Sequence, residues 1–314
     1  MTASAPTRTE TPRRALGILA VSYTTFAWGL VPLVLKEVDM PTLGFTSWRL
    51  WCGVVLNVGA LYATGRRLRW ETIRLCALGG VFFAADISIT FGAFRLTSIA
   101  SASIIGAVAP IFIAIGAARW FGERMERSDL WFGLACFGGV ALVAAGAHDT
   151  SSWSLGGDLL AALGTLSWTT YWLYSKRARR HVGPLEYIAT VMLVAAVCVT
   201  IVTALTGTSL APPRGQDWLW VVSVAIFPGA IGHVLVAWAH RHVEAWLASL
   251  ITQCVPVVAS VAAWIVLGEP LTPLIVVGGL IVLAATAVIV VRVSRREAGE
   301  ADTGDPPLMA DPAG

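Results

Sequence analysis

The sequence predicts an all-α integral membrane protein whose ten transmembrane helices form two inverted five-helix repeats, with both termini in the cytoplasm. Three observations predict this fold class: an apolar composition, ten apolar runs separated by short charged loops, and a pattern that occurs twice. Of the 314 residues, 56% are hydrophobic and 13% are charged, and the mean hydropathy is +0.73. Soluble globular proteins carry about 25% charged residues. So few charges suit a surface that contacts lipid rather than water.

Ten apolar runs follow one another along the chain, each long enough to cross a bilayer as a helix of about 20 residues. They cover about 15–35, 43–63, 73–94, 97–118, 129–147, 157–175, 185–207, 217–239, 245–267 and 271–291. Residues 1–14 are expected to form a polar cytoplasmic tail. Residues 297–314 are polar and rich in Pro and Gly, which predicts a disordered cytoplasmic tail at the other end.

The positions of Lys and Arg predict how the helices are oriented. With the N-terminus inside, eighteen of the 22 basic residues fall in cytoplasmic loops and tails. Only Lys36, Arg95 and Arg214 fall outside, and Arg49 lies within a predicted helix. Cytoplasmic loops of membrane proteins carry an excess of Lys and Arg. The pattern therefore predicts a multi-pass protein of the cytoplasmic membrane with both termini cytoplasmic.

The second half of the chain repeats a pattern from the first half. Both "PIFIAIGAARWFGE", from Pro110 to Glu123, and "PVVASVAAWIVLGE", from Pro256 to Glu269, begin with proline and end with Gly-Glu. Between 102 and 123, seven of 22 residues are identical to those 146 positions later. Proline, glycine and glutamate at one constant offset are not a product of apolar composition, so they indicate an internal repeat.

The repeat divides the predicted helices into two sets of five, over 15–147 and 157–292. Because five is odd, the second set enters the membrane in the opposite sense to the first. Inverted repeats of this kind are typical of secondary transporters, which alternate between inward-open and outward-open states around one central site. Glu123 and Glu269 then end their helices on opposite faces. Each is expected to hold a helix end and its following turn at a gate or loop.

Several segments also resemble one known family. They are "FAWGLVPLVLK" in the first helix, "SWRL" in the second, the two Pro…Gly-Glu segments, and "GDLLAALGTLSWTTYWLYSKR" in the sixth. Together they resemble the drug/metabolite transporter superfamily, in particular its EamA-type ten-helix members, over about residues 15 to 292. The resemblance implies a transporter of small organic solutes, often an exporter of amino acids or related metabolites and drugs.

Three ionisable residues lie within predicted helices. A charge at the centre of a bilayer costs roughly 2.5–3.5 kcal/mol, so such residues usually face the bundle interior or a wet cavity. Arg49 is expected to bind a substrate carboxylate or to tie its helix to a neighbour. Asp86 is expected to accept a substrate amine, to carry a coupling proton, or to pair with Arg49. His233 either relays protons or is a hydrogen-bonded residue packed between helices.

Aromatic residues are candidates for the cavity walls. Trp28 and Trp168 match at an offset of 140 residues, and Tyr171 follows one helical turn later. These rings either stack on a substrate or pack against neighbouring helices.

Polar side chains and prolines mark the middle of the two repeated segments. Ser103, Ser249 and Gln253 precede the prolines and offer hydrogen-bonding groups near the predicted cavity. Small residues there also let helices approach closely. Pro110 and Pro256 each remove a backbone hydrogen bond, so each is expected to kink or hinge its helix.

Other function classes find less support in the sequence. A polytopic membrane enzyme acting on lipid-like substrates is the alternative, but it would need acid and metal-ligand clusters in the loops, and the loops are short and basic. No spacing of Cys and His predicts a metal site, and no phosphate-binding loop predicts ATP-driven transport. We therefore expect no catalysis, no cofactor and no nucleic-acid partner. The expected partners are a small-molecule substrate, the lipid bilayer and a coupling proton, and a homodimer is left open.

Overall fold

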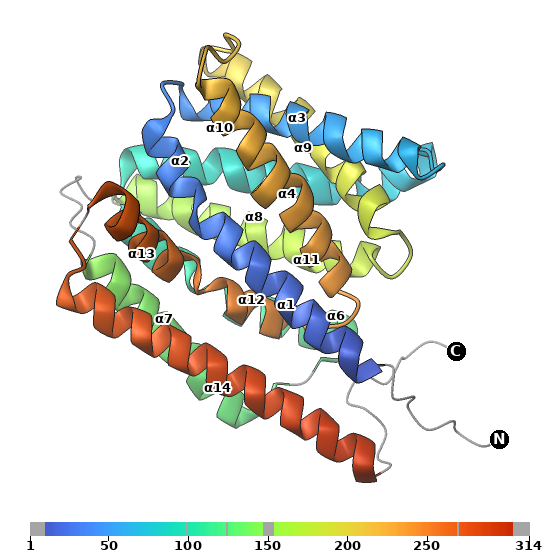
Figure 1. Cartoon of the computed structure of the whole chain (residues 1–314), viewed down its shortest axis with the longest axis vertical. Coiled ribbons are helices and arrows are strands. Elements are labelled where there is room, and N and C mark those ends of the chain that lie inside the picture. Colours follow the sequence, from blue (N-terminus) through green and yellow to red (C-terminus); the bar gives the residue numbers. More distant parts are fainter. Residues whose placement is uncertain (1–9, 98, 124, 147–153, 269, 304–314) are drawn as a thin grey trace.

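The computed structural model describes residues 10–97, 99–123, 125–146, 154–268 and 270–303, and within these ranges the ordered elements are all helices (Figure 1). In chain order they are α1 (Glu10–Gly29), α2 (Val31–Glu37), α3 (Thr42–Ala63), α4 (Trp70–Leu96), α5 (Ile99–Gly106), α6 (Ala109–Phe121), α7 (Arg127–Gly146), α8 (Leu155–Ala178), α9 (Pro184–Leu205), α10 (Asp217–Val224), the π-helix η1 (Ala225–Gly232), α11 (His233–Ala239), α12 (Ala245–Thr252), α13 (Val255–Leu267) and α14 (Pro273–Thr303).

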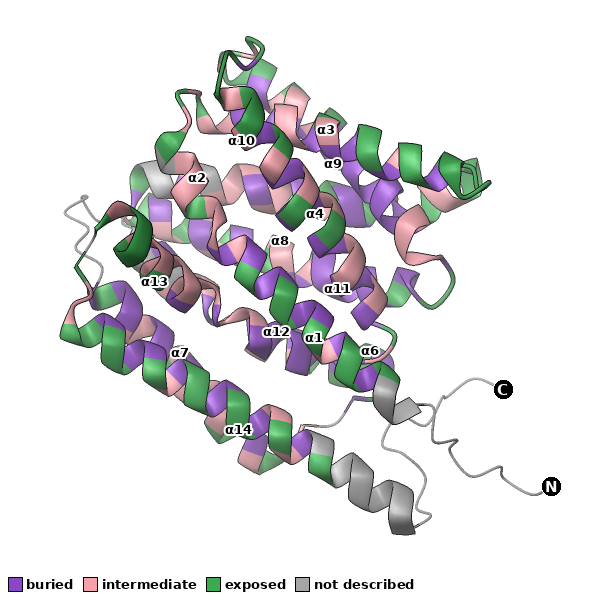
Figure 2. Cartoon of the chain, in the orientation of Figure 1, coloured by how far each residue is buried: buried purple, intermediate pink, exposed green. Residues whose placement is uncertain are grey.

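The helices form a bundle with a helix pair at each end. The helices α7 and α14 pack along each other on one side, and α3 and α9 pack together on the opposite side (Figure 1). Between these pairs, α4 packs along α8, and α1 packs against α11, α12 and η1. Burial follows this arrangement, since the middle helices carry most of the buried residues while α14 shows an exposed outer face (Figure 2).

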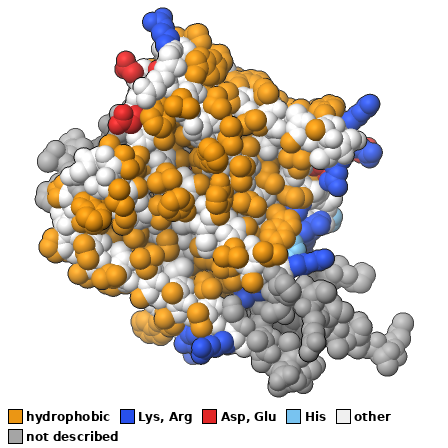
Figure 3. All heavy atoms as spheres, viewed as in Figure 1, with side chains coloured by type: hydrophobic (Ala, Val, Ile, Leu, Met, Phe, Trp, Pro, Cys, Tyr) orange, Lys and Arg blue, Asp and Glu red, His pale blue; other side chains and the backbone are white. Residues whose placement is uncertain are grey.

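The outer surface is apolar, as a lipid-facing surface must be. Leu19, Val55, Ile115, Leu205 and Ile265 are each more than half exposed. Figure 3 shows hydrophobic side chains covering most of one face, while Lys and Arg gather toward its edges. Among the described residues, eight helical stretches are long and apolar enough to cross a membrane. The chain is therefore a multi-pass membrane protein.

The long helices α3 and α8 are not among these eight stretches. Both carry the polar and aromatic residues that the sequence assigned to the interior, including Arg49 on α3 and Trp168 on α8. Because these residues lower the average hydropathy of a helix, α3 and α8 give a weaker membrane signal than helices that are apolar throughout.

Pro110 and Pro256 each stand where a helix is interrupted. The chain breaks after α5 and again after α12, and Pro110 and Pro256 stand in the first turn of the helix that follows each break. A proline lacks the backbone N–H, which is unpaired in the first turn of any helix, so this position is the least unfavourable for it. Pro32 begins α2 in the same way. The expected kinks are thus short interruptions, through which the chain continues as a turn with backbone hydrogen bonds such as that from the Val108 N–H to the Ile105 carbonyl.

The two broken helices have the same bounds at the offset of 146 residues. α12 begins and ends 146 residues after α5, and α13 begins and ends 146 residues after α6. Gly122 and Gly268 cap α6 and α13 with φ of 71° and 68°. This left-handed conformation favours glycine. The Gly of each Gly-Glu pair therefore ends its helix.

Helix α14 and the N-terminal segment are longer than predicted. Helix α14 continues to Thr303, so 297–303 is helical rather than part of a disordered tail. "RREAGEADT" contains good helix formers and a Pro only after it, which explains the extension. Helix α1 already begins at Glu10, so residues 10–14 are helical as well.

Two glycines let α7 and α14 approach closely. A Cβ at Gly278 would lie 2.5 Å from the Gly139 carbonyl oxygen, and a Cβ at Gly139 would lie 2.8 Å from the Gly278 carbonyl oxygen. Since both contacts are with backbone, neither can move aside cheaply. Small residues give membrane helices the close packing that replaces the hydrophobic effect between them.

We expect Gly139→Ala to destabilise the protein by about 1–3 kcal/mol, because the methyl group overpacks this interface. Gly138→Ala is the matched control, since a Cβ at Gly138 meets nothing within 4 Å. The measurement is the midpoint of thermal unfolding in detergent, followed by size-exclusion chromatography. Equal midpoints for the two variants would contradict the close approach of α7 and α14.

Candidate functional site

A cavity of about 220 Å³ lies between α4, α5, α6 and α8. Its walls are Asp86, Thr90, Ala102, Gly106, Ala109, Ala161, Thr165 and Trp168. The break between α5 and α6 forms one wall, because Gly106 ends α5 and Ala109 begins α6. Alanine and glycine leave space at this break, while the polar groups come from α4 and α8.

Asp86 brings the charge to this cavity. Its Oδ1 accepts a hydrogen bond from the Thr90 hydroxyl one turn further along α4, at 3.3 Å. Within the described part of the chain, no ion pair holds the Asp86 carboxylate. A carboxylate has room for several donors. Asp86 therefore keeps acceptor capacity for a ligand in the cavity.

Arg49 is close enough to Asp86 for the two charges to interact, although no ion pair joins them in the described structure. It lies in the first half of α3 and does not contribute to the cavity wall. Among the described residues that line the cavity, none is basic. The cavity therefore presents a negative charge, with a positive charge behind it.

Five rings, counting the imidazole of His233, pack at or beside the cavity. The Trp28 and Trp168 rings meet edge to face, with centroids 5.6 Å apart. His233 is buried, and its ring lies 5.1 Å from that of Trp28 and 4.9 Å from that of Phe83. The Tyr171 hydroxyl and His233 Nδ1 are 3.3 Å apart. Of these aromatic residues, Trp168 lines the cavity, and the others support it from behind.

Two backbone carbonyls of the π-helix η1 accept hydrogen bonds from side chains of α1. Trp28 Nε1 donates to the Pro228 carbonyl at 3.1 Å, and the Thr24 hydroxyl is 3.0 Å from the Gly232 carbonyl. Such partners are needed because lipid offers no hydrogen bonds to freed backbone groups. π-Helical turns often occur at functional sites. Here η1 holds His233 against the Trp28 ring.

Gln253 joins the two chain breaks. Its Nε2 donates to the Ala107 carbonyl at 2.9 Å, and these residues are 146 positions apart. The break in the second broken helix thus contacts the equivalent position of the first. Ser249 is buried in α12, where its hydroxyl donates to the Trp246 carbonyl at 2.8 Å. Gln253 therefore holds the helix crossing, Ser249 bonds within its own helix, and neither lines the cavity.

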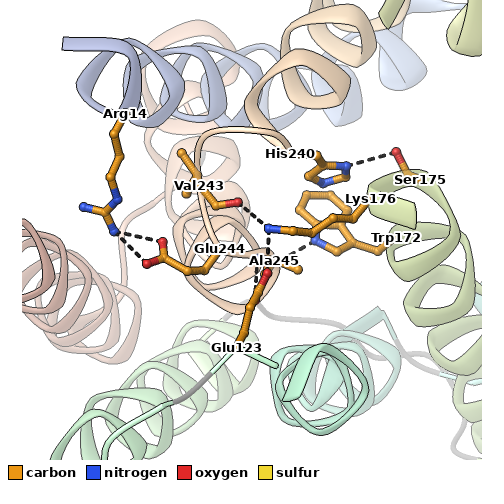
Figure 4. Close-up of polar contacts among 9 residues, drawn as sticks. All are labelled: Arg14, Glu123, Trp172, Ser175, Lys176, His240, Val243, Glu244 and Ala245. Atoms are coloured by element: carbon orange, nitrogen blue, oxygen red, sulfur yellow. Dashed lines mark hydrogen bonds and ion pairs between the residues drawn. The ribbon is translucent and has the colours of Figure 1, made fainter. Parts of the chain in front are cut away.

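The remaining predicted site residues lie near the ends of the bundle or outside the description. Glu123 is buried, and its carboxylate forms an ion pair with Lys176 Nζ at 2.5 Å (Figure 4). Glu269 and the side chain of Ser103 lie outside the described residues. The structure thus brings Asp86 and Trp168 together at one cavity, with Trp28, Tyr171 and His233 behind them.

Sequence reasoning missed two cavity residues, Thr90 and Thr165. A helical-spacing argument could have found both. Thr90 follows Asp86 by four residues and Thr165 precedes Trp168 by three, so each shares a helix face with a predicted site residue. Lys176 was not among the predicted site residues, because its partner Glu123 is distant in sequence.

The EamA-like transporter family matches this chain twice, over residues 15–145 and 155–291. The chain belongs to this family. It is therefore a membrane transporter of the drug/metabolite transporter superfamily, as the resemblance implied.

Curated relatives include exporters. The chain is 28% identical over 247 residues to the "Probable terminal-alkyne amino-acid exporter" of Streptantibioticus cattleyicolor, covering 75% of this chain and 80% of the relative. It is 22% identical over 279 residues to the "Pseudopaline exporter CntI" of Pseudomonas aeruginosa, covering 86% and 94%. It is 24% identical over 280 residues to an "Uncharacterized transporter" of Archaeoglobus fulgidus, covering 87% and 95%.

The fold also matches a solved crystal structure, with a TM-score of 0.78 at 20% sequence identity. The match covers 90% of this chain and 98% of the other. At this identity, the likeness supports the architecture of the bundle and says nothing of its substrate.

We expect Gln253→Leu to destabilise the protein by about 1–3 kcal/mol, because it leaves the buried Ala107 carbonyl without its donor. Ser249→Ala is the control, since its hydroxyl bonds only within α12. The measurement is again the midpoint of thermal unfolding in detergent. A Gln253→Leu midpoint no lower than that of Ser249→Ala would show that the crossing does not depend on this bond.

Proposed function

We propose that this protein is a secondary transporter that moves a small organic solute bearing an amino group by alternating access. The observation that carries the proposal is the Asp86 carboxylate, which faces a cavity at the break of a membrane helix and has no ion-pair partner among the described residues. Charged groups inside a membrane usually mark a substrate or ion pathway.

The cavity chemistry favours an ammonium group. Asp86 offers a carboxylate, Thr90 and Thr165 offer hydroxyls, and the Trp168 ring offers a π-face to a cation. Arg49 interacts with Asp86 from α3, behind the cavity wall. A bound amino acid would therefore have the Asp86 carboxylate beside its ammonium group and the Arg49 guanidinium in the same region for its carboxylate. A volume of about 220 Å³ suits a small metabolite. The printed names of two relatives, an amino-acid exporter and the pseudopaline exporter, point to export of such compounds.

The proposed architecture has ten spans, with α3 and α8 crossing the membrane in addition to the eight apolar stretches. Residues 15–147 and 157–292 form the two repeats in opposite orientation. The shared bounds of the two broken helices support this division, and the distribution of Lys and Arg supports cytoplasmic termini. Exchange of the two repeats' conformations then exposes the cavity to each side in turn.

The proposed coupling ion is the proton, carried by Asp86 rather than by His233. Asp86 borders the cavity, which a proton can reach, whereas His233 is buried among aromatic rings.

We expect Asp86→Asn to reduce transport about tenfold or more, because a hydrogen bond to a charged group contributes about 1.5–3 kcal/mol. Solutes are first identified by metabolite profiling of cells with and without the protein, and are then measured in membrane vesicles. Asp217→Asn makes the same chemical change at the start of α10, away from the cavity, and should leave transport intact. If wild-type vesicles moved no amine-bearing solute in either direction, the proposed function would be wrong.

We expect a green fluorescent protein fused after Gly314 to fluoresce, and an alkaline phosphatase fused there to be inactive, because the C-terminus is proposed to be cytoplasmic. Fusions after Gly207, in the proposed outer loop following α9, should give the opposite pair of results. If both positions gave the same pair of reporter results, the proposed odd number of membrane crossings between them would be excluded.

A further inference from the structure

A buried ion pair joins the two repeats at one end of the bundle. Glu123 follows α6 of the first repeat, and Lys176 lies in the last turn of α8 of the second. Their side chains are 2% and 8% exposed, and the charged atoms are 2.5 Å apart. Figure 4 shows the two side chains meeting below the turn that connects α11 to α12. The contact therefore links three helices rather than two.

Both members of the pair also hold the backbone at the start of α12. Glu123 Oε2 accepts a hydrogen bond from the Ala245 N–H at 2.9 Å, at the positive end of the helix dipole. Lys176 Nζ donates to the Val243 carbonyl at 2.8 Å. Trp172 Nε1 donates to the Ala245 carbonyl at 3.1 Å. The start of α12 is thus fixed by side chains of both repeats.

A second ion pair extends this cluster to α1. Arg14 donates to both carboxylate oxygens of Glu244, at 2.8 and 3.1 Å. Glu244 immediately precedes α12. His240 closes the other side, with its Nδ1 3.0 Å from the Ser175 hydroxyl. Burial, with the nearby charges of Lys176 and Arg179, keeps the pKa of His240 well below its usual value, so His240 is neutral and adds no further charge.

The two equivalent half-helices differ in their surroundings. Residues 245–251 of α12 are all buried. In contrast, α5, its equivalent 146 residues earlier, contributes Ala102 and Gly106 to the cavity wall. The two half-helices therefore differ in what they border: α5 contributes to the cavity wall, whereas α12 packs within the largest buried cluster of the bundle.

We propose that Glu123 and Lys176 form a gate at the cytoplasmic end of the bundle, which keeps α12 buried while the cavity beside α5 is accessible. This inference rests on the proposed alternating-access function and on the proposed orientation. Breaking the pair frees the start of α12 and lets water reach its buried face from the cytoplasm. Both residues are positioning residues, since neither borders the cavity.

The chemistry of the pair suits a contact that forms and breaks. In a buried ion pair, the Coulomb attraction is largely cancelled by the lost hydration of both charges, so the net contribution to stability is small. Removal of one partner is unfavourable because the other charge stays buried without compensation. The pair therefore favours the closed arrangement specifically and still permits opening when both charges regain water.

The test measures cytoplasmic access to α12 in the full-length protein. Ser249→Cys places a thiol on the buried face of α12 with little change in size. Inside-out vesicles are treated with a membrane-impermeant maleimide, and labelling at position 249 is read by peptide mass spectrometry. Labelling should be slow in the otherwise unchanged protein. Glu123→Gln and Lys176→Gln should each accelerate it about tenfold, which corresponds to a gate equilibrium shifted by about 1.4 kcal/mol.

Neighbouring exposed residues give matched controls. Arg177→Gln and Glu71→Gln remove the same charges from exposed positions in α8 and α4 and should leave labelling slow. Lys176→Arg, which keeps the charge, should also stay slow. Should Lys176→Gln or Glu123→Gln fail to give monodisperse protein, Glu123→Asp keeps the charge on a shorter side chain and should label at an intermediate rate.

Slow labelling in a folded Lys176→Gln or Glu123→Gln variant would overturn the gate, as would equal acceleration in Arg177→Gln. The labelling needs no transported solute, so its outcome is independent of the vesicle transport assay. Wild-type vesicles that move no solute would refute the proposed function, whereas transport with unchanged labelling would refute the gate alone.

Discussion

Every backbone polar group in the membrane interior must find its hydrogen-bond partner within the protein, and this constraint shapes the centre of the bundle. Short interruptions separate α5 from α6 and α12 from α13. At each interruption some backbone groups lose the partner that a continuous helix would give them. The bond from Gln253 to the Ala107 carbonyl satisfies one break with a side chain from the other. The breaks therefore occur where the two repeats contact each other.

The same breaks connect the candidate site to the gate. The first break opens the cavity that Asp86 and Trp168 border, and α12, which precedes the second break, is held shut by Glu123 and Lys176. In the proposed cycle, the Gln253–Ala107 hydrogen bond links α12 to the helix that borders the cavity, so a movement that frees α12 would reach the cavity wall through it. One structural element used twice can thus provide a binding site on one side and a closed barrier on the other.

The sequence predicted the class of the protein better than its contacts. The all-helical membrane fold and the family were predictable, because apolar runs and repeated Pro…Gly-Glu segments leave strong local signals. Asp86 was predictable as an interior residue for a similar reason, since an acid in an apolar run stands out. The side-chain partners were not predictable, because Gln253 and Ala107 are 146 residues apart, and Lys176 contacts Glu123 only after both repeats have folded.

Residues that the sequence grouped into one predicted site have different surroundings in the structure. Trp168 borders the cavity, whereas His233 packs among rings and Ser249 bonds within its own helix. A polar residue in a membrane helix shows only that it faces the interior. Which of several interior surfaces it faces depends on helix rotation, and no local pattern fixes that rotation.

In the proposed transport cycle the two repeats exchange roles, so that one end of the bundle opens as the other closes. Spin labels at Arg127 and Arg177 report the gate end, and labels at Leu155 and Leu274 report the opposite end. Double electron–electron resonance in nanodiscs measures the distance within each label pair, in the protein with the unchanged gate and in Lys176→Gln. We predict that the distance at the gate end lengthens in the variant while the distance at the opposite end shortens. A longer gate-end distance with an unchanged opposite end would contradict the exchange.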